Sequence, residues 1–168
     1  VTAPLVEVEG LVKHYRSGGF LSHNAPVVRA VEDVSFAIAP GETLALVGES
    51  GSGKSTVGRA VLRLEVPTAG RVCFEGTDLA TLTPLELRET RSRMQIVFQD
   101  PFASLNPRRT IGASVAEGLE IHEIVPRHEI GDRVAQLLEE VGLDASYASR
   151  YPHEFSGGQR QRIGVARA

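Results

Sequence analysis

The sequence predicts an α/β fold, and three stretches of the 168-residue chain support that prediction. Residues 43–47 form a continuous apolar run, as expected for a strand covered on both faces, and a glycine-rich loop and a helix-forming stretch follow it. Residues 5–16 alternate apolar and polar side chains, which is typical of half-buried strands. From Thr110 onward the pattern is helical. The chain is therefore expected to combine an α/β core with a mostly helical part.

The composition is that of an ordinary globular domain. Hydrophobic residues make up 42% and charged residues 23% of the chain, which argues against disorder. The net charge is −3 and no block of Lys and Arg stands out, so the sequence does not favour nucleic acid as a partner. Cys73, the single cysteine, is predicted to be a small buried hydrophobe. No apolar run approaches the roughly 18 residues of a membrane helix, so we expect a cytosolic protein.

Residues 5–42 predict an antiparallel sheet at the front of the domain. Strands are expected at residues 5–9, 11–16 and 34–38. A loop rich in Gly, Ser, Asn and Pro spans residues 17–26, and a turn at 40–42 ends the third strand. A further strand is expected at 71–75, with turns at 67–70 and 75–78 on either side.

The middle of the chain alternates strands and helices. A helix is expected at 54–64, directly after the glycine-rich loop. Thr83 and Glu86 form a capping box for a second helix, which starts with Pro84 and runs to about Arg93. Residues 95–98 predict another short buried strand.

The helical part begins near residue 105 and ends near residue 155. Within it, one apolar stripe at three- and four-residue spacing consists of Ile130, Val134, Leu137, Leu138 and Val141. Gly142 is a natural end for that helix. We interpret residues 105–155 as a mostly helical subdomain inserted after the 95–98 strand.

A phosphate-binding pattern lies between the 43–47 strand and the helix after it. The pattern G-x-x-x-x-G-K-[ST] and the residue after it comprise Gly48, Glu49, Ser50, Gly51, Ser52, Gly53, Lys54, Ser55 and Thr56. Glycines let backbone N–H groups surround a β-phosphate, and the helix N-terminus adds a favourable dipole. Lys54 places a positive charge on the β- and γ-phosphates, and the Ser55 hydroxyl is a candidate ligand for Mg²⁺. The alternative is a glycine-rich turn with an incidental lysine, which the strand–loop–helix context disfavours.

A second glycine loop precedes the last helix-forming stretch. It consists of Phe155, Ser156, Gly157, Gly158 and Gln159. The Ser156 hydroxyl, the two glycine amides and the dipole of a following helix predict a second anion site. Taken alone, this tetrapeptide from Ser156 to Gln159 is more typical of a helix cap.

The two loops together resemble the ATP-binding cassette (ABC) ATPases. Residues 48–56 resemble the Walker A loop, Gln99 the glutamine of the Q-loop, and residues 155–159 the signature motif, with Phe155 in place of the commoner leucine. The longer phrases at 97–108 and 151–162 are similar to the ATPase subunits of oligopeptide, dipeptide and nickel importers. The resemblance covers the whole chain.

The resemblance implies a P-loop NTPase fold of the ABC nucleotide-binding type. That fold has an antiparallel β subdomain at its N-terminus and an inserted helical subdomain. We expect residues 1–168 to form a single, incomplete domain of this kind. Its parts are an ATP-binding core at 1–104, the helical subdomain at 105–155, and the signature motif with the following helix at 156–168.

The resemblance also assigns roles to individual residues. Tyr15 is expected to stack on adenine, the alternative being an ordinary strand tyrosine. Lys54 and Ser55 are expected to bind ATP and Mg²⁺. Gln99 is expected to reach Mg²⁺ and the attacking water and to sense a membrane subunit. Residues 156–159 are expected to contact the nucleotide held by an opposite subunit.

The chain also departs from the family pattern. No apolar strand ending in Asp-Glu and no switch histidine are found in the 168 residues. Glu139 and Glu140 lie in a stretch with helical spacing, and His153 belongs to the Tyr-Pro-His-Glu phrase. In the family, the Asp-Glu strand lies beside the Walker A strand, so we expect an incomplete central sheet. We also expect no useful ATP hydrolysis by these residues alone.

The leading hypothesis is an ATP-binding subunit that energises import of peptides or related small solutes. It implies a second ABC ATPase subunit, two transmembrane permease subunits, a solute-binding protein, and a peripheral location on the cytoplasmic face of the membrane. One alternative is a fragment that binds nucleotide without hydrolysing it. Another is a soluble ABC ATPase not linked to transport, which the charge and the importer-like phrases disfavour. A small P-loop kinase or GTPase needs neither Gln99 nor residues 155–159 and is disfavoured.

Overall fold

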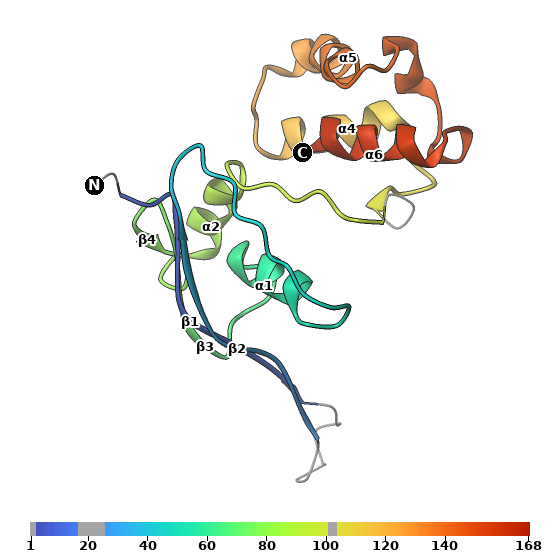
Figure 1. The fold of residues 1–168 in the computed structure, drawn as a ribbon. Coiled ribbons are helices and arrows are strands. Elements are labelled where there is room, and N and C mark those ends of the chain that lie inside the picture. Colours follow the sequence, from blue (N-terminus) through green and yellow to red (C-terminus); the bar gives the residue numbers. More distant parts are fainter. Residues whose placement is uncertain (1–2, 17–25, 101–103) are drawn as a thin grey trace. The chain divides into compact units, whose positions relative to one another are not determined.

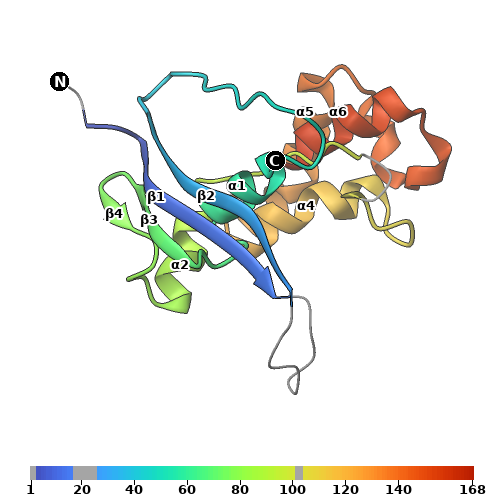
Figure 2. The same ribbon diagram turned by 60° about the horizontal axis from the view of Figure 1, so that its bottom comes forward.

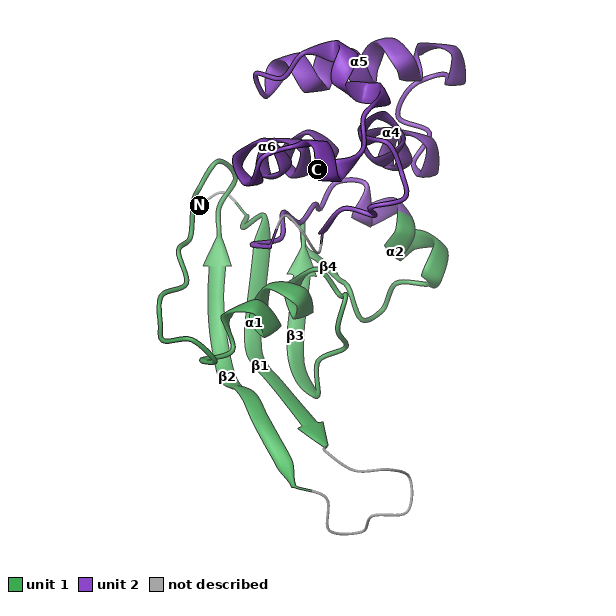
Figure 3. Ribbon diagram, turned by 90° about the vertical axis from the view of Figure 1, so that its right-hand side faces the viewer, with its two compact units in different colours: residues 1–88 green, residues 89–168 purple. Residues whose placement is uncertain are grey.

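A computed structural model describes residues 3–16, 26–100 and 104–168 (Figure 1). The chain divides into two compact units, unit 1 at Val1–Arg88 and unit 2 at Glu89–Ala168 (Figure 3). The strands are β1 (Val6–Arg16), β2 (Val27–Ile38), β3 (Ala69–Phe74) and β4 (Thr77–Asp78). The α-helices are α1 (Lys54–Val61), α2 (Pro84–Arg91), α4 (Ile111–Ile121), α5 (Ile130–Glu140) and α6 (Gly157–Arg167). The 3₁₀ turns are η1 (Arg127–Glu129), η2 (Ala145–Ser149) and η3 (Pro152–Glu154).

Unit 1 is built on an antiparallel sheet with the strand order β2-β1-β3-β4. The antiparallel sheet predicted from the sequence is confirmed, but the strands expected at 5–9 and 11–16 are one strand, β1. Its pairing with β2 is irregular between Val8 and His14. Gly10 has a φ of 55° there, and its amide donates a 2.8 Å hydrogen bond to the Ser35 hydroxyl. The predicted loop at 17–26 falls almost entirely outside the described residues.

Helix α1 packs against one face of this sheet (Figures 2 and 3). It ends at Val61, three residues before the predicted end, and Arg63 has a φ of 52°. Its apolar side chains meet those of the strands because alternate strand residues face the helix. The buried residues of unit 1 are Val8, Leu11, Val31, Val57, Ala60, Val72, Cys73, Phe74 and Leu79. The predicted burial of Cys73 is confirmed.

The second helix of the chain starts as predicted. The Thr83 amide donates to Glu86 Oε2 at 2.8 Å, and the Glu86 amide donates to Thr83 Oγ1 at 3.3 Å. These two bonds form the reciprocal capping box expected from the sequence. Helix α2 ends at Arg91, about one half-turn earlier than predicted.

Two predicted strands are absent from the part of the chain that the structure describes. Residues 43–47 and 95–98 have no strand structure, and their apolar side chains are exposed except for the half-buried Ile96, reaching 93% at Val47 and 47% at Val97. A strand requires a neighbour that pairs with its backbone N–H and C=O groups. None of the described segments pairs with either run. The strands predicted at 43–47 and 95–98 are therefore wrong for this structure.

Unit 2 is helical. In α5 the predicted stripe is confirmed, since Val134 and Leu138 are buried and its other members pack against the same core. Gly142, with a φ of 73°, follows the helix end. The core residues are Leu105, Ile111, Val115, Ala116, Leu119, Val134, Leu138, Leu143, Phe155, Ile163 and Ala166. No helix among the described residues is both long and apolar enough to cross a membrane.

Candidate functional site

The phosphate loop, residues 48–56, has a backbone that requires glycine at two positions. Gly51 has a φ of 84° and Gly53 a φ of 90°, a region that other L-residues rarely adopt. A Cβ atom on Gly53 would lie 2.1 Å from the carbonyl oxygen of Ala30 on β2. The loop can therefore approach the sheet this closely only with glycine at position 53.

The phosphate loop leads into α1 without a side-chain cap. Gly53 is the N-cap residue and no side chain bonds to the first amides of the helix. The first N–H groups of a helix have no partner inside it, and the helix dipole makes this end attractive to anions. The structure therefore provides the backbone arrangement that a phosphate group needs.

The Lys54 side chain folds back over the loop. Its Nζ atom donates to the carbonyl oxygens of Gly48 and Glu49 at 2.7 Å each, and to the Ser52 hydroxyl at 3.2 Å. The ammonium is thus held by oxygen atoms of the phosphate loop itself. Ser55 is exposed and Thr56 is half-buried, both in the first turn of α1.

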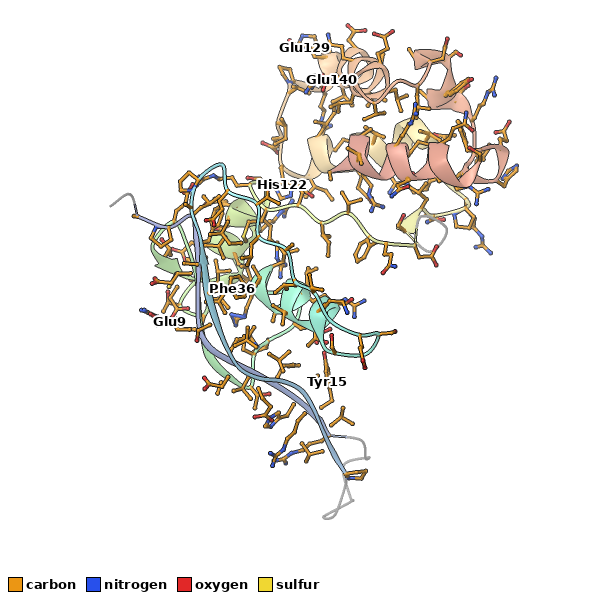
Figure 4. The ribbon with its side chains drawn as sticks, in the orientation of Figure 1. Glu9, Tyr15, Phe36, His122, Glu129 and Glu140 are labelled. Carbon is orange, nitrogen blue, oxygen red and sulfur yellow. The ribbon has the colours of Figure 1, made fainter. Side chains whose placement is uncertain are left out.

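Tyr15 belongs to the same unit and lies on the side of the sheet that α1 covers (Figure 4). Its side chain is 37% exposed, and Lys13 Nζ lies 4.9 Å from the centre of its ring. The Tyr15 hydroxyl donates to the carboxylate of Glu65, which raises the pKa of Tyr15 above its ordinary value. Burial raises that pKa further, and the Thr56 hydroxyl lowers it. Tyr15 is therefore linked to α1, whose first residues belong to the phosphate loop.

The second glycine loop is closed by a capping box at the start of α6. The Ser156 hydroxyl accepts from the Gln159 amide at 3.3 Å, and Gln159 Oε1 accepts from the Ser156 amide at 3.0 Å. Phe155 is buried and meets the Tyr147 ring edge-on at 5.4 Å between ring centres. The helix-cap alternative from the sequence thus describes what Ser156 and Gln159 do in this structure.

A shallow cavity of about 410 Å³ adjoins this second loop. Its lining residues are Gly142, Leu143, Asp144, Tyr147, Ser156, Gly158, Gln159 and Arg162. Arg162 contributes a positive charge, and its Nη1 atom is 3.4 Å from the carbonyl oxygen of Gly142. Asp144 contributes a negative charge, because bonds from Ser146 lower the pKa of its carboxyl. A Cβ atom on Gly158 would meet nothing within 4 Å.

The structure gathers the predicted site residues into two sets. Tyr15 and the phosphate loop belong to unit 1, whereas Gln99 and the second glycine loop belong to unit 2. Gln99 is exposed and lies in a bend. Within the described ranges, no group of three or more His, Cys, Asp or Glu side chains could hold a metal ion.

One contact was not foreseen from the sequence. Glu65 holds the Tyr15 hydroxyl from fifty positions further along the chain. No local pattern marks such a long-range pair, since neither residue belongs to a repeat or a motif that includes the other. The sequence shows only that Glu65 follows directly after the helix predicted at 54–64.

Comparisons of the sequence with known proteins agree on one family. A family model described as ABC transporter matches residues 31–168. "Probable peptide ABC transporter ATP-binding protein y4tS" of Sinorhizobium fredii is 55% identical over 165 residues, covering 98% of this chain and 47% of that protein. "Glutathione import ATP-binding protein GsiA" of Escherichia coli strain K12 is 53% identical, covering 98% of this chain and 27% of that protein. The chain thus spans half or less of the length of these relatives.

Solved structures show the same likeness. The dimeric, post-hydrolysis structure of the ATP-binding cassette MJ0796 bound to ADP and Pi matches with a TM-score of 0.81 and 30% identity. The match covers 96% of this chain and 68% of that one. The cbiO1 protein of Clostridium perfringens, part of a cbiONQ transporter complex, matches with a TM-score of 0.75 and 26% identity.

Proposed function

The chain belongs to the ABC transporter family, and we propose that it is the ATP-binding part of a subunit that energises solute import. In this proposal the phosphate loop binds the phosphates of ATP, and Mg²⁺ accompanies them. ATP hydrolysis by the full-length protein drives transport.

The phosphate loop is the observation that supports this proposal most directly. Gly51 and Gly53 give the loop its backbone, α1 presents an uncapped N-terminus, and the Lys54 ammonium is bonded to oxygen atoms of the loop. Each of the three favours a bound polyphosphate. The MJ0796 cassette, which has the same fold, binds ADP and Pi.

The remaining site residues enter the proposal with separate roles. Tyr15 stacks on the adenine base, and Ser55 contributes its hydroxyl to Mg²⁺. Gln99 positions Mg²⁺ and the attacking water. Residues 156–159 contact the nucleotide of an opposite subunit. The phosphate loop and Tyr15 lie in unit 1, whereas Gln99 and residues 156–159 lie in unit 2.

The proposed cargo is a peptide or a related small solute. The relatives just described are named for peptide transport and glutathione import, and glutathione is itself a small peptide. The full-length protein then pairs with a second ATPase subunit and with two permease subunits, and a solute-binding protein delivers the cargo. Such a subunit is peripheral, on the cytoplasmic face of the membrane.

These 168 residues alone are proposed to bind ATP without turning it over. The 168 residues contain no apolar run ending in Asp-Glu that could supply the general base, and no candidate for the switch histidine. Loss of a general base costs about 10²–10⁴ in rate. Multiple turnovers of ATP by the purified chain, abolished by Lys54→Ala, would contradict this part of the proposal.

The proposal is tested by binding of MgATP to the chain. A ligand at 100 times its dissociation constant stabilises the folded state by about 2.7 kcal/mol. Lys54→Ala removes the ammonium from the phosphates, and we expect most of the thermal shift to disappear. Arg29→Ala is the matched control, since it removes a positive charge from the exposed surface of β2 in the same unit. An equal shift in wild type and Lys54→Ala would overturn the assignment.

A further inference from the structure

The segment that follows α1 fixes the side chain of Tyr15. The Tyr15 hydroxyl donates to the Glu65 carboxylate, and Glu65 Oε1 lies 3.5 Å from Nη1 of Arg59 in the last turn of α1. The Glu65 side chain is only 22% exposed, so water competes weakly for its carboxylate. Glu65 therefore connects the tyrosine on β1 with the helix that begins at the phosphate loop.

Lys13 holds the same ring from one face. Its Nζ atom lies 4.9 Å from the ring centre and donates to the carbonyl oxygen of Val66 at 2.8 Å. Lys13 and Tyr15 are two positions apart on β1 and both reach the Glu65–Val66 segment. Because a cation covers one face of the ring, only the opposite face is left for a planar ligand.

Hydrogen bonds also fix the backbone around the Tyr15–Glu65 contact. The His14 amide donates to the Thr68 hydroxyl at 2.9 Å, and the Thr68 amide donates to the carbonyl oxygen of Val12 at 2.8 Å. The Glu65 amide bonds to the carbonyl oxygen of Arg59 at 3.3 Å. Glu65 thus has a defined position relative to both β1 and α1, which a group that orients another side chain requires.

We propose that Glu65 is a positioning residue for the nucleotide base, because its bond to the Tyr15 hydroxyl fixes the ring in the orientation that receives the base. This inference rests on the proposed role of Tyr15. A hydroxyl engaged by Glu65 does not contact the edge of the base, so the ring contributes stacking alone. Glu65 itself touches neither base nor phosphate.

The test compares a ligand that has a base with one that has none. Dissociation constants of the chain for MgATP and for magnesium tripolyphosphate are measured by calorimetry. Glu65→Ala frees the Tyr15 ring, and we expect the MgATP constant to rise about fivefold, the scale of ordering one side chain on binding. Tripolyphosphate needs only the phosphate loop, so its constant stays within about twofold. Glu65→Gln keeps an acceptor oxygen and restores most of the MgATP affinity.

A second variant removes the same hydrogen bond from its other end. Tyr15→Phe keeps the ring but loses the hydroxyl. It is expected to raise the dissociation constant for MgATP by the same factor as Glu65→Ala. The double variant is expected to bind MgATP no more weakly than either single variant, because each single variant already removes the Tyr15–Glu65 hydrogen bond. Glu9→Ala is the matched control, since it breaks the 2.8 Å ion pair with Arg71 on the opposite side of the sheet (Figure 4).

Three outcomes overturn the inference. The first is an unchanged MgATP constant in both Glu65→Ala and Tyr15→Phe. The second is an equal loss for MgATP and tripolyphosphate, which shows general damage to α1. The third is additive losses in the double variant. Failure of the proposed function gives a different result, because wild type and Lys54→Ala would then bind tripolyphosphate equally. In that case the inference about Glu65 is wrong as well.

Discussion

The two glycine loops of the chain differ in how the helix after each one begins. The N-cap residue of α1 is Gly53, which has a left-handed backbone and offers no side-chain cap. The N-cap residue of α6 is Ser156, and the side chains of Ser156 and Gln159 each accept a hydrogen bond from the backbone N–H of the other residue. The first backbone N–H groups of α1 are left for a ligand, whereas in α6 the backbone N–H of Gln159 is already bonded to the Ser156 hydroxyl. Similar composition therefore gives one open anion site and one that is partly closed by the protein itself.

The two loops also differ in whether the surrounding fold requires their glycines. Gly53 lies against the carbonyl oxygen of Ala30, so the fold itself requires it. A Cβ atom on Gly158 would meet none of the described residues within 4 Å, so no close approach within the described structure requires glycine there. In the proposed function, glycine at this position lets the backbone approach a phosphate of an opposite subunit.

The largest expected effect follows from Gly158. We expect Gly158→Asp to stop transport by the assembled transporter, because a side chain and a negative charge would meet the phosphate there. The chain should fold normally, since the site is open and an acidic residue is favourable in the first turn of a helix. MgATP binding by the isolated chain should be unchanged. If Gly158→Asp abolished that binding in a folded chain, the second loop would act on the nucleotide of its own subunit.

A graded series of alanines is expected to show the dependence of the phosphate loop on glycine. Gly53→Ala combines a positive φ with a backbone clash and should destabilise the chain by about 3 kcal/mol or more. Gly51→Ala has the positive φ but no clash, and about 1 kcal/mol is expected. Gly58→Ala, inside α1 with open space around it, should stabilise by about 0.5–1 kcal/mol. Urea unfolding measures all three, and equal losses at positions 51 and 53 would contradict the clash.

The smallest effect concerns the cap of α6. Ser156→Ala removes the hydroxyl that accepts a hydrogen bond from the backbone N–H of Gln159, and it should lower the free energy of unfolding by about 1 kcal/mol. Ser156→Asp keeps an acceptor and is the control, with a loss close to zero. The measurement is again urea unfolding, followed by a signal from unit 2. Unchanged stability in Ser156→Ala would mean that the capping box contributes nothing in solution.

Local patterns predicted much of this fold. The capping box at Thr83 and Glu86, the apolar stripe of α5 and the antiparallel sheet of unit 1 all depend on residues close in sequence or on simple alternation. Element ends were less accurate, since α1 stops at Val61 and β3 begins at Ala69. Such ends depend on single backbone angles, for example the left-handed Arg63, that composition does not reveal.

Long-range pairing accounts for what could not be predicted. The apolar run at 43–47 has the composition of a buried strand, but a strand exists only with a partner, and the described segments supply none. The Tyr15–Glu65 bond is the converse case, a contact that is present but was not predicted. It joins residues fifty positions apart, and no motif includes both of them. The motifs located the candidate site residues, whereas the roles of Tyr15, Gln99 and residues 156–159 stay predictions.

In this structure the Lys54 ammonium already has three hydrogen-bond partners, so binding a phosphate would replace bonds that it has made. An ammonium has three protons to donate, and in this structure two carbonyl oxygens and one hydroxyl accept them. An arriving phosphate must displace these acceptors, so the number of hydrogen bonds hardly changes and the gain comes from the negative charge. If Lys54 binds phosphate as proposed, we expect polyphosphates to compete better with the loop's own oxygens than nucleoside monophosphates, which carry less negative charge. In the proposed function, the bonds that Lys54 makes within its own loop would therefore favour ligands with several negative charges.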